Sequence, residues 1–100
     1  MSRLPADRPP TPPGVVLLHD FIEPLGLSQS EVAAAIGVPF QRLNAVVRGR
    51  RALTPSTALR LARYFGTSAG VWTDLQAKVD LHTALVAEGE AIAAIEPLAA

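Results

Sequence analysis

The chain of 100 residues carries nine basic residues, nine acidic residues and no cysteine. Its length allows one hydrophobic core but not two, and the lack of cysteine excludes disulfides and thiolate metal sites. No apolar run reaches the roughly twenty residues of a membrane span, and the first residues lack the apolar core of a signal peptide, so we expect a cytoplasmic protein.

The N-terminal part of the chain predicts a flexible arm followed by a helix. Residues 1–13 hold five of the nine prolines, which helix interiors exclude because proline has no backbone N–H. From Gly14 a helix is expected to run until Pro24 ends it. His19 and Glu23 lie four residues apart within it, which suits a surface hydrogen bond better than a metal site. The apolar residues that recur there with helical period are Val15, Val16, Leu18, Phe21, Ile22 and Leu25.

Residues 28–47 predict two short helices joined by a tight turn. Ser28 and Glu31 have the spacing of a capping box at the start of the first helix. Gly37 can leave that helix in a left-handed conformation. Pro39 is expected at the first position of the second helix, and Gly49 is expected to end it.

The spacing within this stretch is that of a helix-turn-helix. Counted from Gln29, a small residue (Ala33) is fifth and a glycine (Gly37) is ninth, as two helices crossing at a wide angle require. Apolar residues stand at the fourth, eighth, tenth, fifteenth and eighteenth positions, which are Val32, Ile36, Val38, Leu43 and Val46. This pattern resembles the Cro/cI repressor family. An ordinary helical hairpin in an all-α bundle is the alternative.

Two further helices complete an all-α, five-helix domain of Cro/cI type, predicted over residues 14–80. Thr54 and Ser68 are the expected N-caps, and Gly66 separates the helices. On the fourth helix, Arg60 and Arg63 are expected to point outward. On the fifth, Trp72 suits either the core or a dimer interface. We assign that interface to Trp72, Leu75 and Val79.

Residues 81–100 predict an alanine-rich helical extension. Its apolar stripe comprises Leu81, Leu85, Ile92 and Ile95. A stripe beyond a complete domain needs a cover, which can be the domain itself, a second protomer or another protein.

The charges are segregated along the chain although they cancel overall. Between Glu31 and Asp74 there are six arginines and no acidic residue, whereas the remaining chain has nine acidic residues against three basic ones. This predicts one strongly positive end, as phosphate binding requires.

The residues expected to meet double-stranded DNA follow from the docking geometry of this motif, in which the second helix reads base edges. Gln41 and Asn44 can bind adenine through two hydrogen bonds, and Arg42 can bind guanine or a phosphate. Phe40 and Ala45 are candidates for contact with a thymine methyl group. The expected backbone contacts come from Ser28, Gln29, Arg48, Arg50 and Arg51.

A longer stretch is similar to the HigA antitoxins, a branch of the Cro/cI family. The similarity covers roughly residues 13–81 and rests on EPLGLS, GRR followed by Thr54, TALRLARYFGTS and W--LQ---DL. It departs from the family at Pro12-Pro13-Gly14-Val15, where His-Pro-Gly-Glu is usual, and at Phe40 and Gln41. The resemblance implies a homodimer that represses its own operon at a palindromic operator and neutralises a HigB-like ribonuclease toxin.

Three other functions are compatible with parts of this pattern. The chain could be a stand-alone transcriptional regulator without a toxin, or a purely protein-binding helical domain, although the acid-free stretch argues against the latter. An enzyme is disfavoured because the carboxylates are scattered and no nucleophile has a base partner. We expect no catalytic residue, no cofactor and no metal.

Overall fold

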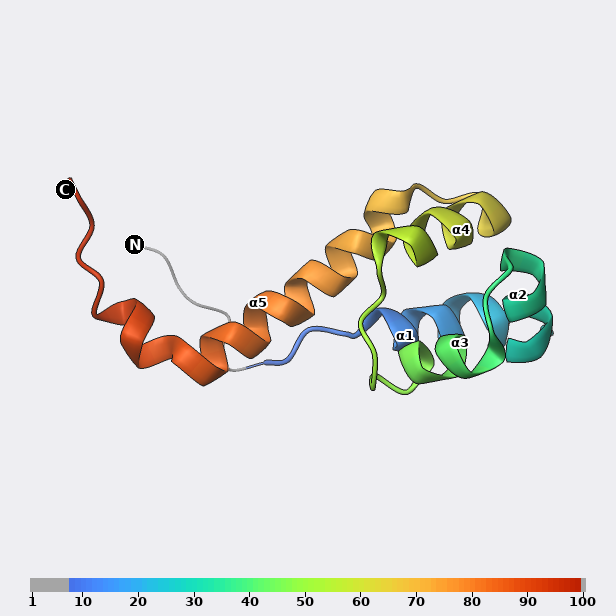
Figure 1. Ribbon diagram of the computed structural model, residues 1–100, viewed down its shortest axis with the longest axis horizontal. Helices are drawn as coiled ribbons and strands as arrows, with labels where there is room; N and C mark the ends of the chain where they lie inside the picture. Colours follow the sequence, from blue (N-terminus) through green and yellow to red (C-terminus); the bar gives the residue numbers. More distant parts are fainter. Residues whose placement is uncertain (1–7, 100) are drawn as a thin grey trace.

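The computed structural model describes residues 8–99, and every regular element within them is helical (Figure 1). Five α-helices and one π-helical segment follow one another along the chain. They are α1 (Pro13–Val16), η1 (Leu17–Ile22), α2 (Gln29–Ile36), α3 (Phe40–Val47), α4 (Pro55–Phe65) and α5 (Ala69–Ala93). The expected all-α, five-helix fold is confirmed.

The first helix begins one residue before the expected Gly14 and changes type along its length. Pro13 is its first residue, where the missing N–H costs no helical hydrogen bond. From Leu17 onward the turns widen to a π-helix, which the Glu23 N–H closes by donating to the Leu18 carbonyl at 2.9 Å. A turn over residues 23–26, which includes Pro24, follows, so the expected end of this helix is confirmed.

The helix-turn-helix forms as the local signals predict. The Ser28 hydroxyl accepts from the Glu31 N–H at 3.0 Å, and the Glu31 carboxylate accepts from the Ser28 N–H at 2.8 Å. Gly37 ends α2 in the left-handed region, with φ of 74°. Pro39 is the N-cap of α3 rather than its first residue, which corrects the prediction by one position.

The core joins all five α-helices and η1 around α3 and Trp72. Trp72 is completely buried, its ring centroid lies 5.1 Å from that of Phe21, and its Nε1 donates to the Thr67 Oγ1 at 2.9 Å. The assignment of Trp72 to a dimer interface is therefore wrong, because no surface of this side chain is left for a partner. The buried apolar residues are Leu17, Ile22, Val32, Ala33, Ile36, Val38, Leu43, Val46, Leu53, Ala58, Leu61 and Trp72.

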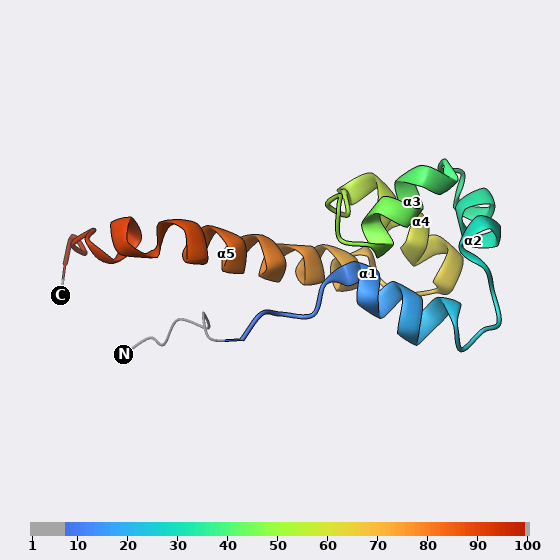
Figure 2. The ribbon, with the colours of Figure 1, turned by 90° about the horizontal axis from the view of Figure 1, so that it is seen from below.

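Helix α5 extends well beyond the domain. It has 25 residues and crosses the boundary predicted at residue 80 without interruption, so the domain and the start of the extension share one helix. A kink lies at Glu88, whose φ of −128° is not helical. The described chain consequently measures 51 × 22 × 22 Å, with α5 projecting from the bundle of shorter helices (Figure 2).

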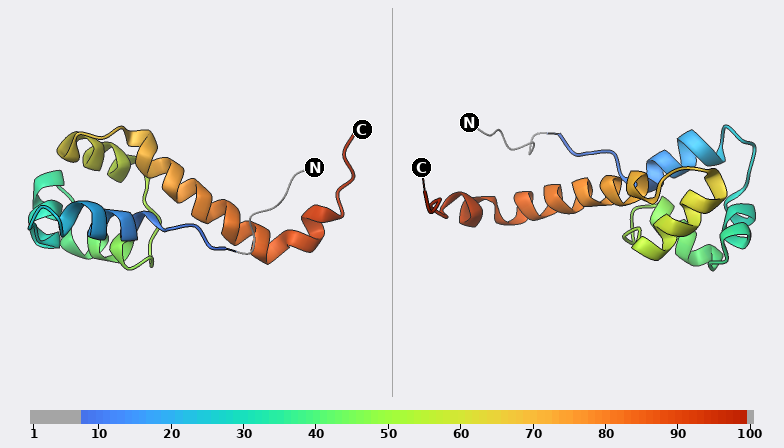
Figure 3. Two further views of the ribbon diagram at one scale, coloured as in Figure 1. Left: turned by 180° about the vertical axis from the view of Figure 1, so that it is seen from behind. Right: turned by 90° about the horizontal axis from the view of Figure 1, so that it is seen from above.

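The proline-rich segment before α1 runs along α5 (Figure 3). Arg8 and Pro10 line an apolar groove together with residues of that helix. The expected flexible arm thus packs beside α5 where it is described, and residues 1–7 lie outside the described part.

Candidate nucleic-acid interface

Helix α3 presents a polar face to solvent and an apolar face to the core. Leu43 and Val46 are buried, which holds the helix in place. Gln41 and Arg42 are exposed near its N-terminus, and Phe40 keeps 43% of its surface accessible. Phe40 therefore points outward, where it can meet a thymine methyl group.

A hydrogen bond between the two helices of the motif orients one of the candidate base-reading residues. The Asn44 Nδ2 donates to the Gln29 Oε1 at 3.0 Å, in a partly buried position. Asn44 keeps its second N–H and its carbonyl oxygen, which are the two groups that bind the edge of adenine. Gln29 therefore orients Asn44 through its carbonyl oxygen, and its NH₂ group makes no hydrogen bond among the described residues.

The loop after α3 holds three exposed arginines on a fixed backbone. Gly49 adopts a left-handed conformation with φ of 73°, and the N–H groups of Arg50 and Arg51 both donate to the Ala45 carbonyl. Leu53 anchors the loop in the core. Within residues 8–99, the guanidinium groups of Arg48, Arg50 and Arg51 make no hydrogen bond or ion pair, and their exposure suits contact with phosphates.

The remaining candidates lie at the edges of this surface. Ser28 is exposed at the start of α2, where its hydroxyl accepts from Glu31 and can still donate to a phosphate. Ala45 is half-buried, and its carbonyl is occupied by the following loop, so only its methyl group is offered to DNA.

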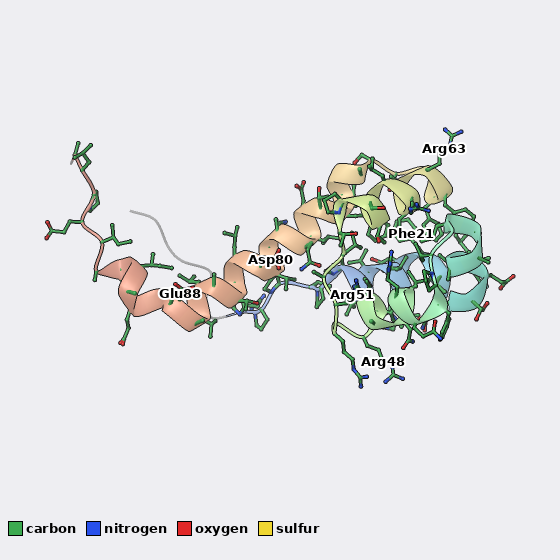
Figure 4. The ribbon with its side chains drawn as sticks, in the orientation of Figure 1. Phe21, Arg48, Arg51, Arg63, Asp80 and Glu88 are labelled. Carbon is green, nitrogen blue, oxygen red and sulfur yellow. The ribbon has the colours of Figure 1, made fainter. Side chains whose placement is uncertain are left out.

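The six arginines of the acid-free stretch do not form one positive end. Arg60 turns toward the helix-turn-helix, where its Nη1 donates to the Ile36 carbonyl at 2.7 Å. Arg60 is exposed, as expected, but its guanidinium group is bound to the end of α2. Arg63 does point outward, but on the opposite side of the molecule from Arg48 (Figure 4).

Two residues that support this surface were not assigned a role from the sequence. Arg60 binds the end of α2, and the Gln76 Oε1 accepts from the Leu53 N–H at 2.8 Å and so ties the arginine loop to α5. Gln76 is the glutamine of the W--LQ---DL motif that carries the resemblance to HigA, and this motif was the only feature of the sequence that pointed to a role for it. No feature of the sequence points to the role of Arg60, because an arginine on a helix can also simply be exposed to solvent.

Comparison with known proteins identifies the family. The helix-turn-helix family model matches residues 18–72. The chain is 41% identical to virulence-associated protein I of Dichelobacter nodosus over an aligned stretch of 78 residues. That stretch covers 78% of this chain and 72% of the relative. It matches the Pseudomonas aeruginosa antitoxin HigA, solved with the higBA promoter, at a TM-score of 0.84 and 39% identity, over 89% of this chain and 98% of that one. The chain belongs to the HigA branch of the helix-turn-helix family.

The likeness of this HigA-type chain to its relatives includes the long helix. Antitoxin GraA in complex with its operator matches at a TM-score of 0.86 and 32% identity, over 98% of this chain and 100% of that one. The projecting α5 is therefore part of the shared architecture. Within residues 8–99, no helix is long and apolar enough to cross a membrane.

Proposed function

We propose that this chain is a sequence-specific transcriptional repressor that binds a palindromic operator as a homodimer, and that it is also the antitoxin of a HigB/HigA-type operon in the cytoplasm. Structures of HigA with its promoter and of GraA with its operator support the DNA-binding part by likeness.

The pairing of Gln29 with Asn44 is the observation that carries DNA binding. It holds one base-reading amide beside Gln41 and Arg42, whose side chains are exposed on the same end of α3. A purely protein-binding domain has no need of a polar, preorganised helix end next to a loop of three arginines. The combination of oriented amides and free guanidinium groups fits base edges and phosphates together.

Homodimerisation is supported by the exposed face of α5. One recognition helix reads only a few base pairs, so useful specificity needs two copies on a two-fold operator. Leu81, Leu85 and Ile92 line the apolar groove on α5, and His82 beside them has a buried Nδ1 without a hydrogen-bond partner among the described residues. We propose that a second α5 covers this groove. Leu75 and Val79 are half-buried on α5 and do not line this groove, and Leu75 packs against the core.

Neutralisation of a toxin is supported by the family and by charge. Asp20 and Glu23 are exposed at η1, and Glu88 and Glu90 are exposed at the kink of α5; all four lie outside the acid-free stretch. A basic ribonuclease would be attracted to such acidic surface by charge complementarity. We propose that the toxin binds acidic side chains outside the acid-free stretch, at η1 or at the kink of α5, and leaves the face of α3 accessible to DNA.

Replacement of Gln41 by alanine tests base reading. We expect operator binding to weaken by about 1–3 kcal/mol, with relaxed preference at a single base pair, because a hydrogen-bonding pair to one base is lost. Binding to a panel of operators with single base changes, measured by fluorescence anisotropy, checks this. A uniform loss over the whole panel would instead place Gln41 at the DNA backbone.

Co-expression tests the antitoxin part. The product of the adjacent gene should arrest growth alone, and this chain should restore growth and co-purify with that product. If the neighbour is harmless, or is toxic without forming a complex, the chain is a stand-alone regulator. If operator binding is also absent, the protein-binding domain is the better description.

A further inference from the structure

A shallow groove between α2 and α4 combines exposed apolar side chains with positive charge. Leu59 keeps 63% of its surface accessible and Tyr64 keeps 42%. Arg63 stands beside them and projects into solvent (Figure 4). The groove is lined by Ala35, Ile36, Leu59, Arg60, Arg63 and Tyr64. An apolar segment with a carboxylate fits such a surface.

The C-terminal tail of the chain has that composition. Ile95 and Leu98 are 70% and 104% exposed, and Glu96 lies between them in the sequence. Pro97 restricts Glu96 to extended or polyproline conformations. In a polyproline helix with three residues per turn, Ile95 and Leu98 share one face. In that conformation the tail would present two apolar side chains together, with a carboxylate next to them.

The tail and the groove lie at opposite ends of the same molecule. The described chain is 51 Å long, with its C-terminus at one end and α2 and α4 at the other (Figure 1). A tail can therefore reach this groove only on another copy of the chain.

We propose that residues 95–98 of one copy bind the α2–α4 groove of a second copy. Ile95 and Leu98 cover Leu59 and Tyr64, and Glu96 pairs with Arg63. Because Arg63 and Arg48 point to opposite sides of the molecule, the contact leaves the arginine loop free for DNA. The inference requires neither an operator nor a toxin, and so goes beyond the proposed function.

Disulfide trapping tests the contact, because the native chain has no cysteine. A tagged full-length chain with Ala35→Cys, in the groove, is mixed with an untagged chain with Ala99→Cys, beside the tail. Ala35 and Ala99 are both exposed, and Ala35 lines the groove. Neither side chain makes one of the proposed contacts, so the two substitutions leave those contacts intact. Under mild oxidation we expect the mixed disulfide to form roughly tenfold faster than with Ala52→Cys in the arginine loop, because docking raises the effective concentration. Equal rates for the two positions would overturn the proposal.

A charge exchange in the same trapping experiment tests the ion pair. Arg63→Glu in the Ala35→Cys chain should slow trapping by about two- to fivefold, and Glu96→Arg in the Ala99→Cys chain should restore it. A folding defect caused by Arg63→Glu could not be repaired by a change in another molecule's tail. If neither change affects the rate, or the second fails to restore it, Glu96 does not pair with Arg63 and the proposal fails.

Discussion

At the scale of single residues, equal charges serve different purposes according to where they lie. Arg48 and Arg63 are both exposed, but they point to opposite sides of the molecule (Figure 4). Only Arg48 adjoins the surface of α3 that carries the candidate base-reading residues. Position, and not the count of arginines, therefore decides which of them can neutralise DNA phosphates.

Arg48→Ala should weaken binding to all DNA sequences alike. One lost phosphate contact lowers the slope of log affinity against log salt concentration by about one unit. Titrations at several salt concentrations measure that slope. Arg63→Ala, which removes an equal charge on the far side, should leave the slope unchanged. If both variants lower the slope equally, the effect comes from net charge and not from contact.

Gly14→Ala should destabilise the fold, because α1 and α3 touch at this glycine. A Cβ added to Gly14 would lie 2.2 Å from the Val46 carbonyl oxygen and 2.7 Å from the Val47 Cα. Both are backbone atoms, which cannot move away without displacing α3. We expect a loss of about 1–3 kcal/mol in the free energy of unfolding, measured in urea.

Gly89→Ala is the matched control for this prediction. A Cβ there meets nothing within 4 Å, and Gly89 lies within α5. Alanine should therefore be neutral or should stabilise the helix by about 0.5–1 kcal/mol. A Gly14→Ala protein as stable as this control would show that α1 and α3 are not in close contact.

At the scale of elements, the helix-turn-helix is held by contacts from helices outside it. Arg60 on α4 binds the Ile36 carbonyl at the end of α2, where carbonyl groups lack helical partners. Gln76 on α5 binds the backbone of the arginine loop at Leu53. Helices α4 and α5 thus hold the end of α2 and the loop after α3 in place.

Arg60→Met tests the contact with α2. Methionine keeps much of the aliphatic stem but loses the hydrogen bond to Ile36, so we expect unfolding to become easier by about 1 kcal/mol, since the site is partly exposed. Chemical denaturation measures this value. The control is Arg63→Met: the Arg63 side chain makes no hydrogen bond within the described part of the chain, so this change should alter stability by less than about 0.5 kcal/mol. Equal stability of the two variants would remove Arg60 from this role.

At the scale of the whole molecule, α5 both completes the core and carries an uncovered apolar face. Trp72 in its first turns is buried against Phe21, whereas Leu81 further along is 71% exposed. One helix thus links the interior of the domain to a surface that suits a second copy. In the proposed homodimer, α5 would therefore contribute both to the core of the domain and to the contact between the two copies.

Leu81→Asp should convert the dimer to a monomer and weaken operator binding together. A carboxylate in the centre of an apolar interface should cost about 2 kcal/mol or more in dimerisation. Sedimentation and operator titration measure the two effects. Thr83→Asp is the control, because its position lies about 200° around the helix from Leu81, away from the groove. A Leu81→Asp protein that stays dimeric would exclude this face as the dimer interface.

Most of the candidate DNA-binding residues could be predicted from the sequence, because their positions follow from the register of one helix. Buried Leu43 and Val46 place Gln41 and Arg42 outward by helical period alone. The hydrogen bond between Gln29 and Asn44 could not be foreseen in the same way. It joins residues fifteen positions apart, and it depends on the angle at which α2 crosses α3.

The sequence by itself determined the helix starts at Ser28, Thr54 and Ser68 and the turns at Gly37 and Gly66, because caps and left-handed glycines depend on residues within a turn of each other. Only the tertiary structure decided which arginine binds a carbonyl group, which glycine admits no side chain and where Trp72 lies. Arg60 and Ile36 are 24 residues apart, and their contact exists only once α4 has packed on α2. Such contacts depend on the relative placement of whole helices, which the packing of all their side chains sets together.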